Sequence, residues 1–488
     1  MRAADLLLEP VKKYRESINP PYKRKDLISI VGTVFILLAI PLTVFVAVKV
    51  RPWGPRAAGT AAAPTTIGSV IEPGSMVSGA SYIVFAEGTN YYAKDGKTGE
   101  IKFSASDDAA PVINAAISAL PSGGGKVVLA EGTFMIRSSI LRPTGTRLWL
   151  EGQGIRSTTI MLASGVNDYC FKKSTAGVVY ETKISDLLFH VDKANNPDGG
   201  GIDVTGLHAL SLANVEVFES GSKDGIYGDG YKENINGQTW YNVRVSKSSH
   251  DGIHLINGAG YLISHSQSNF NTRGWYIQSA YESFFDAIDA DQNGEWSFVI
   301  ENSNRSSFKI KNFESGAGGV NVIGNYTYSN IIELQSYRNP KALSSGAGLR
   351  IADGPHDNHF LVDIGEHYPG MTKSVILEST AGVNNTITGR VEGLVINNSQ
   401  GNIFQHLQGY VTENSGTATI TSSSNYVDVN HGIAVPPSAD DIQVTATNNL
   451  GNASEFWISD VGASSFRINV NVAPGVSTAT FVWKAEVK

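Results

Sequence analysis

The chain has 488 residues, too many for one compact core, so several modules are expected. Its formal net charge of −7 and its pI near 5.8 argue against nucleic acid as the main partner. The single cysteine, Cys170, excludes an intrachain disulfide framework, and its neighbours Tyr169 and Phe171 indicate a small core residue rather than a reactive thiol.

The N-terminal segment predicts a membrane anchor. Residues 1–26 form a polar tail with seven Lys and Arg, and residues 27–48 follow as 22 residues without a charge. Such a run can cross a hydrocarbon core of roughly 30 Å as a helix. The positive-inside bias places the N-terminus in the cytoplasm and every later residue outside. The alternative is a cleaved signal peptide, cut within residues 58–63.

The next segments predict a tether and one soluble helix. Residues 49–80 are rich in Pro, Ala, Gly, Ser and Thr, a composition typical of a flexible linker. A helix is expected over 107–120, with Ser106 or Asp107 accepting hydrogen bonds from its free N–H groups. Its apolar stripe consists of Val112, Ile113, Ala116, Ile117 and Leu120.

A repeated pattern predicts a solenoid. A small residue, mostly Gly, precedes an apolar residue at the start of each short strand, and the apolar members recur every 20 to 30 residues or so, a period typical of solenoid repeats. These inward candidates are Ile202, Ile226, Ile253, Trp275, Trp296, Val320 and Leu349. One coil of a parallel β-helix needs about this many residues. We therefore predict an all-β chain whose main domain, residues 81–412, is a right-handed parallel β-helix.

The segment before the repeats carries a family resemblance. Its landmarks are Ser106-Asp107-Asp108-Ala109-Ala110, the predicted helix, Gly123-Gly124-Gly125 and Glu131-Gly132-Thr133-Phe134. They resemble the opening of pectate-lyase-like β-helix proteins, more narrowly the rhamnogalacturonase/epimerase-like pectate lyase domain that also occurs in viral tailspikes. The resemblance implies that the helix caps the N-terminal end of the solenoid. The sequence lacks the catalytic segments of pectate lyases and polygalacturonase-type hydrolases, so no catalytic residue is carried over.

The C-terminal residues, 413–488, alternate in short strands and predict a small β-sandwich-like module. Trp457 and Trp483 are expected in its core. We expect this module to act as a C-terminal cap or as a unit that assembles a homotrimer. The alternative is a carbohydrate-binding role.

Candidate site residues follow from aligning the coils. With Ile202, Ile226 and Ile253 inside, the next residue of each strand points outward. The outward row is then Asp203, Tyr227, His254 and Tyr276, and the preceding corner carries Asp224, Asp251 and Arg273 with His250 beside them. We assign Asp224, Asp251, His254 and Arg273 as catalytic candidates and Asp203, Tyr227, His250 and Tyr276 as substrate-binding candidates. The alternative for the Asp-Gly pairs is ordinary turn formation.

These residue types suit two reactions on a glycan. In a lyase, Arg273 would hold a uronate carboxylate while His254 or Tyr276 moves a proton. In a hydrolase, Asp224 and Asp251 would share the acid and base or nucleophile roles. We assign no metal ligand and no cofactor. Asp286, Asp289 and Asp291 form a weaker calcium candidate, because their spacing on a strand predicts that they split between two faces.

The sequence thus favours a membrane-anchored extracellular β-helix protein that acts on polysaccharide as a lyase, hydrolase or epimerase. The alternative is a non-catalytic surface adhesin or spike that binds glycans. Clustering of the candidate residues on one face would favour the first function, and their dispersal would favour the second.

Overall fold

The computed structural model describes residues 79–337, 347–365 and 373–487. The predicted basic tail (1–26), the predicted membrane span (27–48) and nearly all of the predicted tether (49–80) lie outside the described residues. Within the described ranges, no helix is both long enough and apolar enough to span a membrane.

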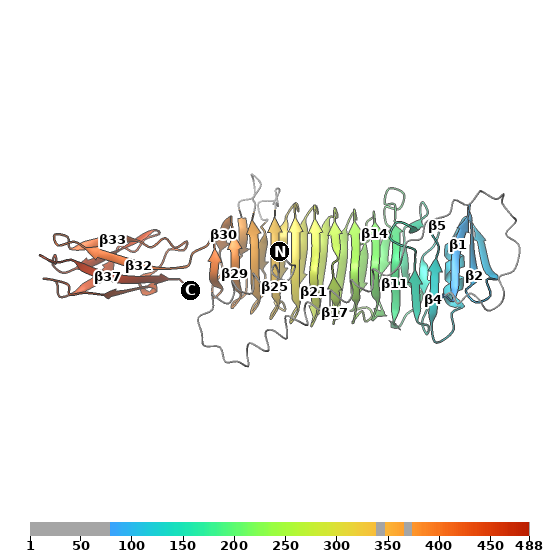
Figure 1. Cartoon of the computed structure of the whole chain (residues 1–488), viewed down its shortest axis with the longest axis horizontal. Helices are drawn as coiled ribbons and strands as arrows, with labels where there is room; N and C mark the ends of the chain where they lie inside the picture. The colour runs from blue at the N-terminus through green and yellow to red at the C-terminus, as the bar shows by residue number, and fades with distance from the viewer. Residues whose placement is uncertain (1–78, 338–346, 366–372, 488) are drawn as a thin grey trace, which may run out of the picture. The chain divides into compact units, whose positions relative to one another are not determined.

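Short strands stacked coil upon coil form the main body of the described chain (Figure 1). Successive coils contribute strands to two long sheets, and within each sheet a strand pairs in parallel with the strand one coil away. The predicted right-handed parallel β-helix is therefore confirmed, and it is the fold that the resemblance to pectate-lyase-like proteins implies.

The two long sheets are named here sheet A and sheet B. Among the described residues, sheet B has eleven strands: β6 (Ile140–Arg142), β9 (Tyr169–Lys173), β12 (Gly200–Asp203), β15 (Ile226–Asp229), β17 (Asp251–Ala259), β20 (Arg273–Tyr281), β22 (Trp296–Glu301), β24 (Gly318–Ile323), β26 (Leu349–Ala352), β28 (Lys373–Leu377) and β30 (Leu394–Asn397). The parallel part of sheet A comprises β4 (Gly125–Leu129), β5 (Gly132–Ile136), β7 (Leu148–Glu151), β8 (Thr158–Leu162), β11 (Thr182–His190), β14 (Ser211–Phe218), β16 (Thr239–Ser246), β18 (Leu262–Ser264), β19 (Gln267–Asn269), β21 (Phe284–Asp291), β23 (Ser307–Phe313), β25 (Ile331–Tyr337), β27 (His359–Gly365), β29 (Thr386–Val391) and β31 (Ile403–Gln408). Two short strands, β10 (Val179–Tyr180) and β13 (Leu207–His208), pair separately.

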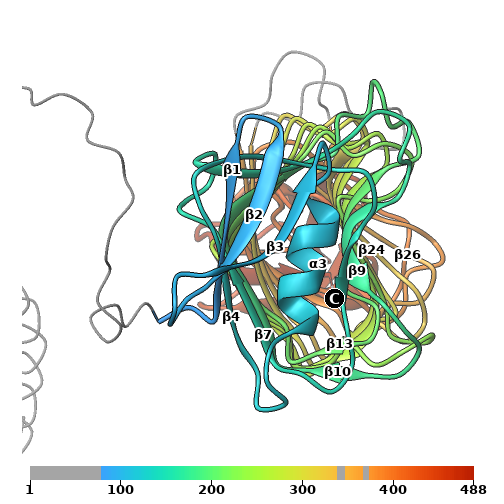
Figure 2. The ribbon, with the colours of Figure 1, turned by 90° about the vertical axis from the view of Figure 1, so that its right-hand side faces the viewer.

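The N-terminal end of the described chain differs from the regular coils. Three strands, β1 (Tyr82–Glu87), β2 (Asn90–Asp95) and β3 (Ile101–Ser106), pair antiparallel, and helix α3 (Ala110–Ser118) follows (Figure 2). Val112, Ile113 and Ile117 of α3 are buried in the same apolar core as the coils. The helix is shorter than the predicted 107–120. Asp108, rather than Ser106 or Asp107, accepts the backbone N–H of Ala110 at 3.0 Å.

Inward apolar side chains hold the coils together. Ile226, Ile253 and Trp275 stand opposite one another in register, and each is 0 % exposed. The alignment at Trp296 is wrong by two residues, because Phe298 stands opposite Trp275 and Val320. Trp296 is half-buried, while Phe298 is 1 % exposed. Ser297 occupies the corner position that Gly has in other coils, so a pattern based on Gly does not identify Phe298 as the inward residue of this strand.

A column of buried asparagines ties four coils at one corner. Asn330, Asn358, Asn385 and Asn402 are each at most 5 % exposed. The side-chain oxygen of each later member accepts both the backbone N–H and the side-chain N–H of the member before it, at 2.9–3.2 Å. Every corner amide in this column is therefore satisfied without water, as buried polar groups require.

We expect Asn358→Ala to lower the free energy of unfolding by about 1–3 kcal/mol, because it leaves the buried N–H groups of Asn330 without an acceptor. The midpoint of thermal unfolding, followed by circular dichroism, should fall. The exposed Asn398→Ala serves as the control and should leave it unchanged. Equal midpoints for the two variants would contradict this account of the column.

The C-terminal strands form two antiparallel sheets around a second apolar core. One sheet contains β32 (Glu413–Ile420), β37 (Ala479–Glu486) and β34 (Ile442–Ala446); the other contains β33 (Tyr426–Asn430), β36 (Ser465–Val470) and β35 (Phe456–Ser459), and a 3₁₀ turn, η1, spans Ala439–Asp441. Trp483 is buried as expected. The prediction for Trp457 is wrong, because its side chain is 48 % exposed. It pairs across the sheet with Asn469, on the outer face of β36, whose inner face carries Phe466, Ile468 and Val470.

Candidate active site

Three consecutive coils bring the candidate residues together at the start of β15, β17 and β20. Asp251 lies in register with Arg273, and His254 lies in register with both Tyr227 and Tyr276. The coils approach closely here because glycine precedes each inward residue. A Cβ placed on Gly252 would lie 2.9 Å from the backbone oxygen of Gly274 on the next coil, so a larger residue would push the coils apart.

The carboxylate of Asp224 is held between two imidazole rings. His250 Nδ1 donates to Asp224 Oδ1 at 2.5 Å, and His254 Nδ1 donates to Asp224 Oδ2 at 3.1 Å. The backbone N–H of Asp251 also donates to Asp224 Oδ1, at 3.1 Å. With each Nδ1 occupied by a hydrogen, the Nε2 atom of each ring carries the lone pair, an assignment made from the hydrogen-bond geometry.

Asp251 lies at the buried bottom of the cluster. Its side chain is 0 % exposed, and Arg273 donates to both of its oxygens, from Nε at 2.6 Å and from Nη2 at 2.8 Å. This bidentate pair supplies the positive charge that a buried carboxylate requires. Asp251 therefore fixes Arg273 in place, and its carboxylate has no route to a bound substrate.

Aromatic rings continue the cluster along the outward row. His254 stacks on Tyr276 with ring centroids 4.6 Å apart, and its edge meets Tyr227 at 5.6 Å. Tyr227 in turn stacks on Tyr169, with the centroids 6.5 Å apart. The Arg273 guanidinium lies over the Tyr276 ring at 4.5 Å. These contacts fix the orientation of His254, whose Nε2 is buried without a hydrogen-bond partner among the described residues.

The environment shifts the pKa values of two members. Burial alone would lower the pKa of His250, but the hydrogen bond to Asp224 and the charges of Asp251 and Asp224 outweigh it, so the pKa is raised above 6.5. Burial, followed by the hydrogen bond to Glu301, raises the pKa of Tyr276, so this phenol keeps its proton. The His250 side chain is 49 % exposed, whereas that of His254 is 14 % exposed.

Seven of the eight candidates thus lie in one cluster: Asp224, Tyr227, His250, Asp251, His254, Arg273 and Tyr276. Asp203 stands one coil before Tyr227 in the same row, where it accepts the backbone N–H of Thr205 and forms a turn. Burial raises its pKa. The residue that sequence reasoning missed is Glu301. The two-residue misalignment at Trp296 hid it, because the true register places Glu301 opposite Gln278, beside Tyr276.

The cluster contains donor atoms that suit a cation. One ligand atom each of Asp224, His250 and Asp251 lies within 4.8 Å of the others. Both carboxylates, however, already have charged or hydrogen-bonding partners in Arg273 and the two imidazoles. Groups of the protein itself therefore already bind both carboxylates in this structure.

The second acidic group lies on sheet A. Asp289 and Asp291 flank the buried Ala290 on the outer face of β21, and Asp286 is exposed. The prediction that the three residues split between two faces is wrong, because a bulge at Ala287, with φ 51°, shifts the register between Phe285 and Ile288. Burial, with the charges of Asp289 and Glu314, raises the pKa of Asp291 to about 6.

This raised pKa predicts a pH-dependent stability. A carboxyl whose folded-state pKa exceeds its unfolded value stabilises the fold when protonated, and this contribution is lost as pH rises from about 4 to about 6. Asp291→Asn should therefore raise the unfolding midpoint at pH 7.5 by several degrees and change it little at pH 4. Asp286→Asn, on the exposed neighbour, should shift neither. An equal gain at both pH values would contradict the titration of Asp291.

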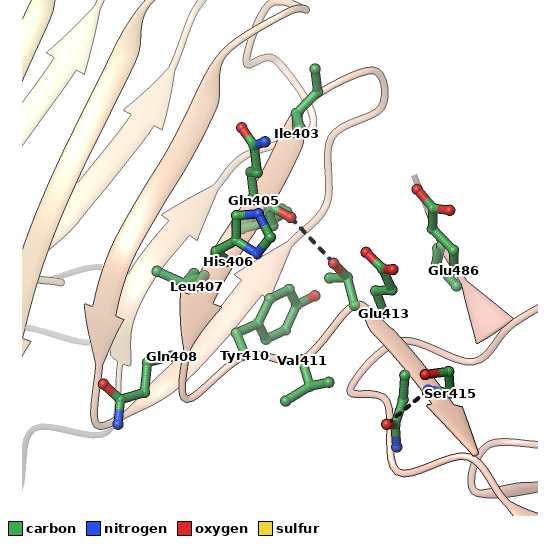
Figure 3. Close-up of a pocket in the computed structure, with 14 residues that line it drawn as sticks. Ile403, Gln405, His406, Leu407, Gln408, Tyr410, Val411, Glu413, Ser415 and Glu486 are labelled. Atoms are coloured by element: carbon green, nitrogen blue, oxygen red, sulfur yellow. Dashed lines mark hydrogen bonds between the residues drawn. The ribbon is translucent and has the colours of Figure 1, made fainter. Parts of the chain in front are cut away.

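A cleft of about 850 Å³ lies far from these residues in sequence (Figure 3). It is lined by β31, the segment 410–412, the start of β32 and the end of β37, with Ile403, His406, Tyr410, Glu413 and Glu486 among its residues. Thr412 Oγ1 donates to the backbone oxygen of Phe404 within it. Among its described lining residues, no imidazole is paired with a carboxylate, so it lacks the oriented groups of the Asp224 cluster.

No family model matches the chain, and no curated protein matches it. Among solved structures, the chain is similar to the A-module of mannuronan C-5 epimerase AlgE6 of Azotobacter vinelandii, with 17% identity over 62% of this chain and 95% of that chain, at a TM-score of 0.38. It is also similar to DFA-IIIase of Arthrobacter chlorophenolicus A6 without its lid, with 16% identity over 62% of this chain and 87% of that chain, at 0.42. The enzymatically active domain of tailspike protein 2 of bacteriophage CBA120 has 12% identity over 80% of this chain and 69% of that chain, at 0.41. Likenesses at this level do not assign an activity.

Proposed function

We propose that this protein is an enzyme that acts on a polysaccharide by moving a proton at a sugar ring, as a lyase or an epimerase does. One observation carries the proposal: the Asp224 carboxylate holds the Nδ1 atoms of His250 and His254 and so leaves Nε2 of the half-exposed His250 as a base. A carboxylate that fixes the tautomer and direction of an imidazole is a recurring arrangement in proton-transfer enzymes.

His250 is the better base of the two. Its half-exposed side chain can meet a sugar ring, whereas His254 is stacked against Tyr276 and largely covered. The Tyr276 hydroxyl donates to Glu301, so Tyr276 holds its ring against His254 and lines the site rather than supplying the proton. Arg273 donates to Asp251 through Nε and Nη2, so Nη1 is the atom that would bind a uronate carboxylate.

The reaction then balances as follows. His250 Nε2 removes the C5 proton of a uronate residue, and the electron pair left on C5 is delocalised into the carboxylate. In a lyase, the bond between C4 and the glycosidic oxygen breaks, a C4–C5 double bond forms, and the leaving oxygen receives the proton that His250 removed. In an epimerase, no bond to oxygen breaks; water delivers a proton to C5 from the opposite face of the ring, and His250 releases its proton to solvent.

A polymer suits the site better than a small molecule. The outward row places Asp203, Tyr227, His254 and Tyr276 on successive coils, each about 4.8 Å from the next. This row of side chains runs parallel to the axis of the solenoid, so consecutive residues of a linear glycan could bind along it. A hydrolase is the weaker proposal, because Asp251 is fully buried and both oxygens of Asp224 are engaged.

A second candidate is a non-catalytic glycan-binding spike, and it is favoured by the binding of both carboxylates, Asp224 and Asp251, to groups of the protein itself. For either function we propose that residues 27–48 anchor the chain in the cell membrane with the β-helix outside, and that α3 closes the N-terminal end of the solenoid core. We also propose that three copies of the chain assemble as a homotrimer.

The test is a reaction in D₂O with polygalacturonate, alginate and a glucuronate-containing capsular polysaccharide as substrates. Deuterium incorporated at C5 indicates an epimerase, whereas ultraviolet absorbance of unsaturated uronates, which form with loss of the C5 hydrogen, indicates a lyase. New reducing ends without unsaturation would instead indicate a hydrolase. No change in any substrate, together with retention of the protein on one of them, would favour the spike.

A further inference from the structure

The outer face of the sheet β33–β36–β35 carries two exposed aromatic side chains in one cross-strand row. Tyr426 is 44 % exposed, Trp457 is 48 % exposed, and both pair with the same residue, Asn469, from opposite sides. Cross-strand partners point to the same face of a sheet. Two strand spacings separate the aromatic residues, so their backbones lie about 10 Å apart.

Polar groups complete this surface, here called the aromatic face and made of Tyr426, Asp428, Trp457, Arg467 and Asn469. Asn469 Nδ2 donates to Ser459 Oγ at 2.9 Å, and its Oδ1 accepts no hydrogen bond within the described residues. Arg467 donates to Asp428 at 2.8 and 3.2 Å, and its guanidinium lies over the Tyr426 ring at 4.1 Å. Arg467 therefore covers one face of the Tyr426 ring, and the other face is the one left for a ligand.

The charge of the aromatic face selects among ligands. Its cation, Arg467, is paired with two carboxylates, those of Asp428 and Asp460. The face therefore has no surplus positive charge for a polyanion, unlike the row along the solenoid, where Arg273 can meet a carboxylate. Exposed aromatic rings interspersed with hydrogen-bonding groups are suited to a ligand that is flat, hydroxylated and uncharged.

We propose that the aromatic face binds an uncharged glycan chain. Tyr426 and Trp457 would stack on sugar rings of an extended chain, and the Asn469 amide between them would hydrogen-bond to a sugar hydroxyl. This binding site is separate from the Asp224 cluster and does not depend on the function proposed for that cluster. It gives the protein a second binding specificity, for neutral glycans, beside the specificity for acidic glycans proposed for the solenoid.

The test uses the full-length protein in native gels that contain arabinoxylan, galactomannan, mixed-linkage β-glucan, polygalacturonate or alginate. At least one neutral polysaccharide should retard wild type, and Trp457→Ala or Tyr426→Ala should weaken the retardation about tenfold. Trp457→Phe keeps an aromatic ring and should retain most of it. The control, Tyr326→Ala, removes an exposed tyrosine of the β-helix and should behave as wild type. Tyr276→Ala, in the solenoid row, should also leave retardation by the neutral polysaccharide unchanged.

Three results would overturn the proposal. The first is an absence of retardation by all three neutral polysaccharides. The second is retardation that Trp457→Ala leaves unchanged, or that only the polyanions produce. The third is concentration-dependent assembly in sedimentation velocity that Trp457→Ala abolishes, which would assign the face to contacts between copies of the chain.

Discussion

His250→Ala should lower the rate of proton exchange or elimination by about 10²–10⁴-fold, the usual cost of removing a positioned acid or base. The reason is the geometry of one ring: Asp224 holds His250 Nδ1 at 2.5 Å, which leaves Nε2 as a base on a half-exposed side chain. The rate is measured as deuterium incorporation or as absorbance of unsaturated uronates. The unfolding midpoint should fall only modestly, because the buried Asp224 keeps His254 Nδ1 and the backbone N–H of Asp251 as donors.

The matched controls separate this role from general damage. His356→Ala removes another partly exposed histidine that bonds an aspartate, Asp357, and should keep the full rate. Asp224→Asn keeps the shape of the side chain but weakens its hold on the two imidazoles, so it should lower the rate and alter its pH profile. If His250→Ala keeps full activity while His254→Ala loses it, the base is His254 and our assignment is wrong.

Arg273→Met should destabilise the protein by about 3–5 kcal/mol, because it leaves the Asp251 carboxylate buried without its charge partner. Asp251 is 0 % exposed, and Arg273 occupies both of its oxygens. Each coil of a solenoid is stabilised by its neighbours, so the damage should spread along the stack. Calorimetry should record a lower midpoint of unfolding.

A double variant tests whether charge is the cause. Asp251→Asn combined with Arg273→Met removes both charges and should recover much of the lost stability. Arg305→Met breaks an exposed pair with Glu282 and should cost at most about 1 kcal/mol. A double variant as unstable as Arg273→Met alone would show that lost packing, rather than the unpaired carboxylate, causes the damage.

The sequence predicted the β-helix and most of the cluster because both depend on short-range periodicity. Once Ile226 and Ile253 are inside, the parallel register places Tyr227, His254 and Tyr276 in one row. The spacing of the repeats therefore carried enough information to bring Asp224, Asp251 and Arg273 together as well. No long-range contact had to be guessed.

The failures occur where local features interrupt that periodicity. Ser297 replaces the corner glycine, so Trp296 was aligned in place of Phe298 and Glu301 was missed. Ala287 adopts a left-handed conformation in a bulge, which reunites Asp286 with Asp289 and Asp291. The exposure of Trp457 depends on which face of a three-stranded sheet meets the core, and an apolar side chain by itself does not reveal this.

The Asp224 cluster comes from one uninterrupted stretch of chain, from Asp224 on one coil to Tyr276 two coils later, with Glu301 on the next. Most active sites are gathered from distant parts of a sequence, whereas the members of this cluster all lie between Asp224 and Glu301. One continuous gene segment, here called the cassette, therefore encodes the entire Asp224 cluster. Duplication of this segment would copy the whole cluster, and deletion of whole coils elsewhere would leave it intact. Recombination between β-helix genes could move such a cassette as one piece into a solenoid of another length, provided that the inward residues at its two ends fit their new neighbours.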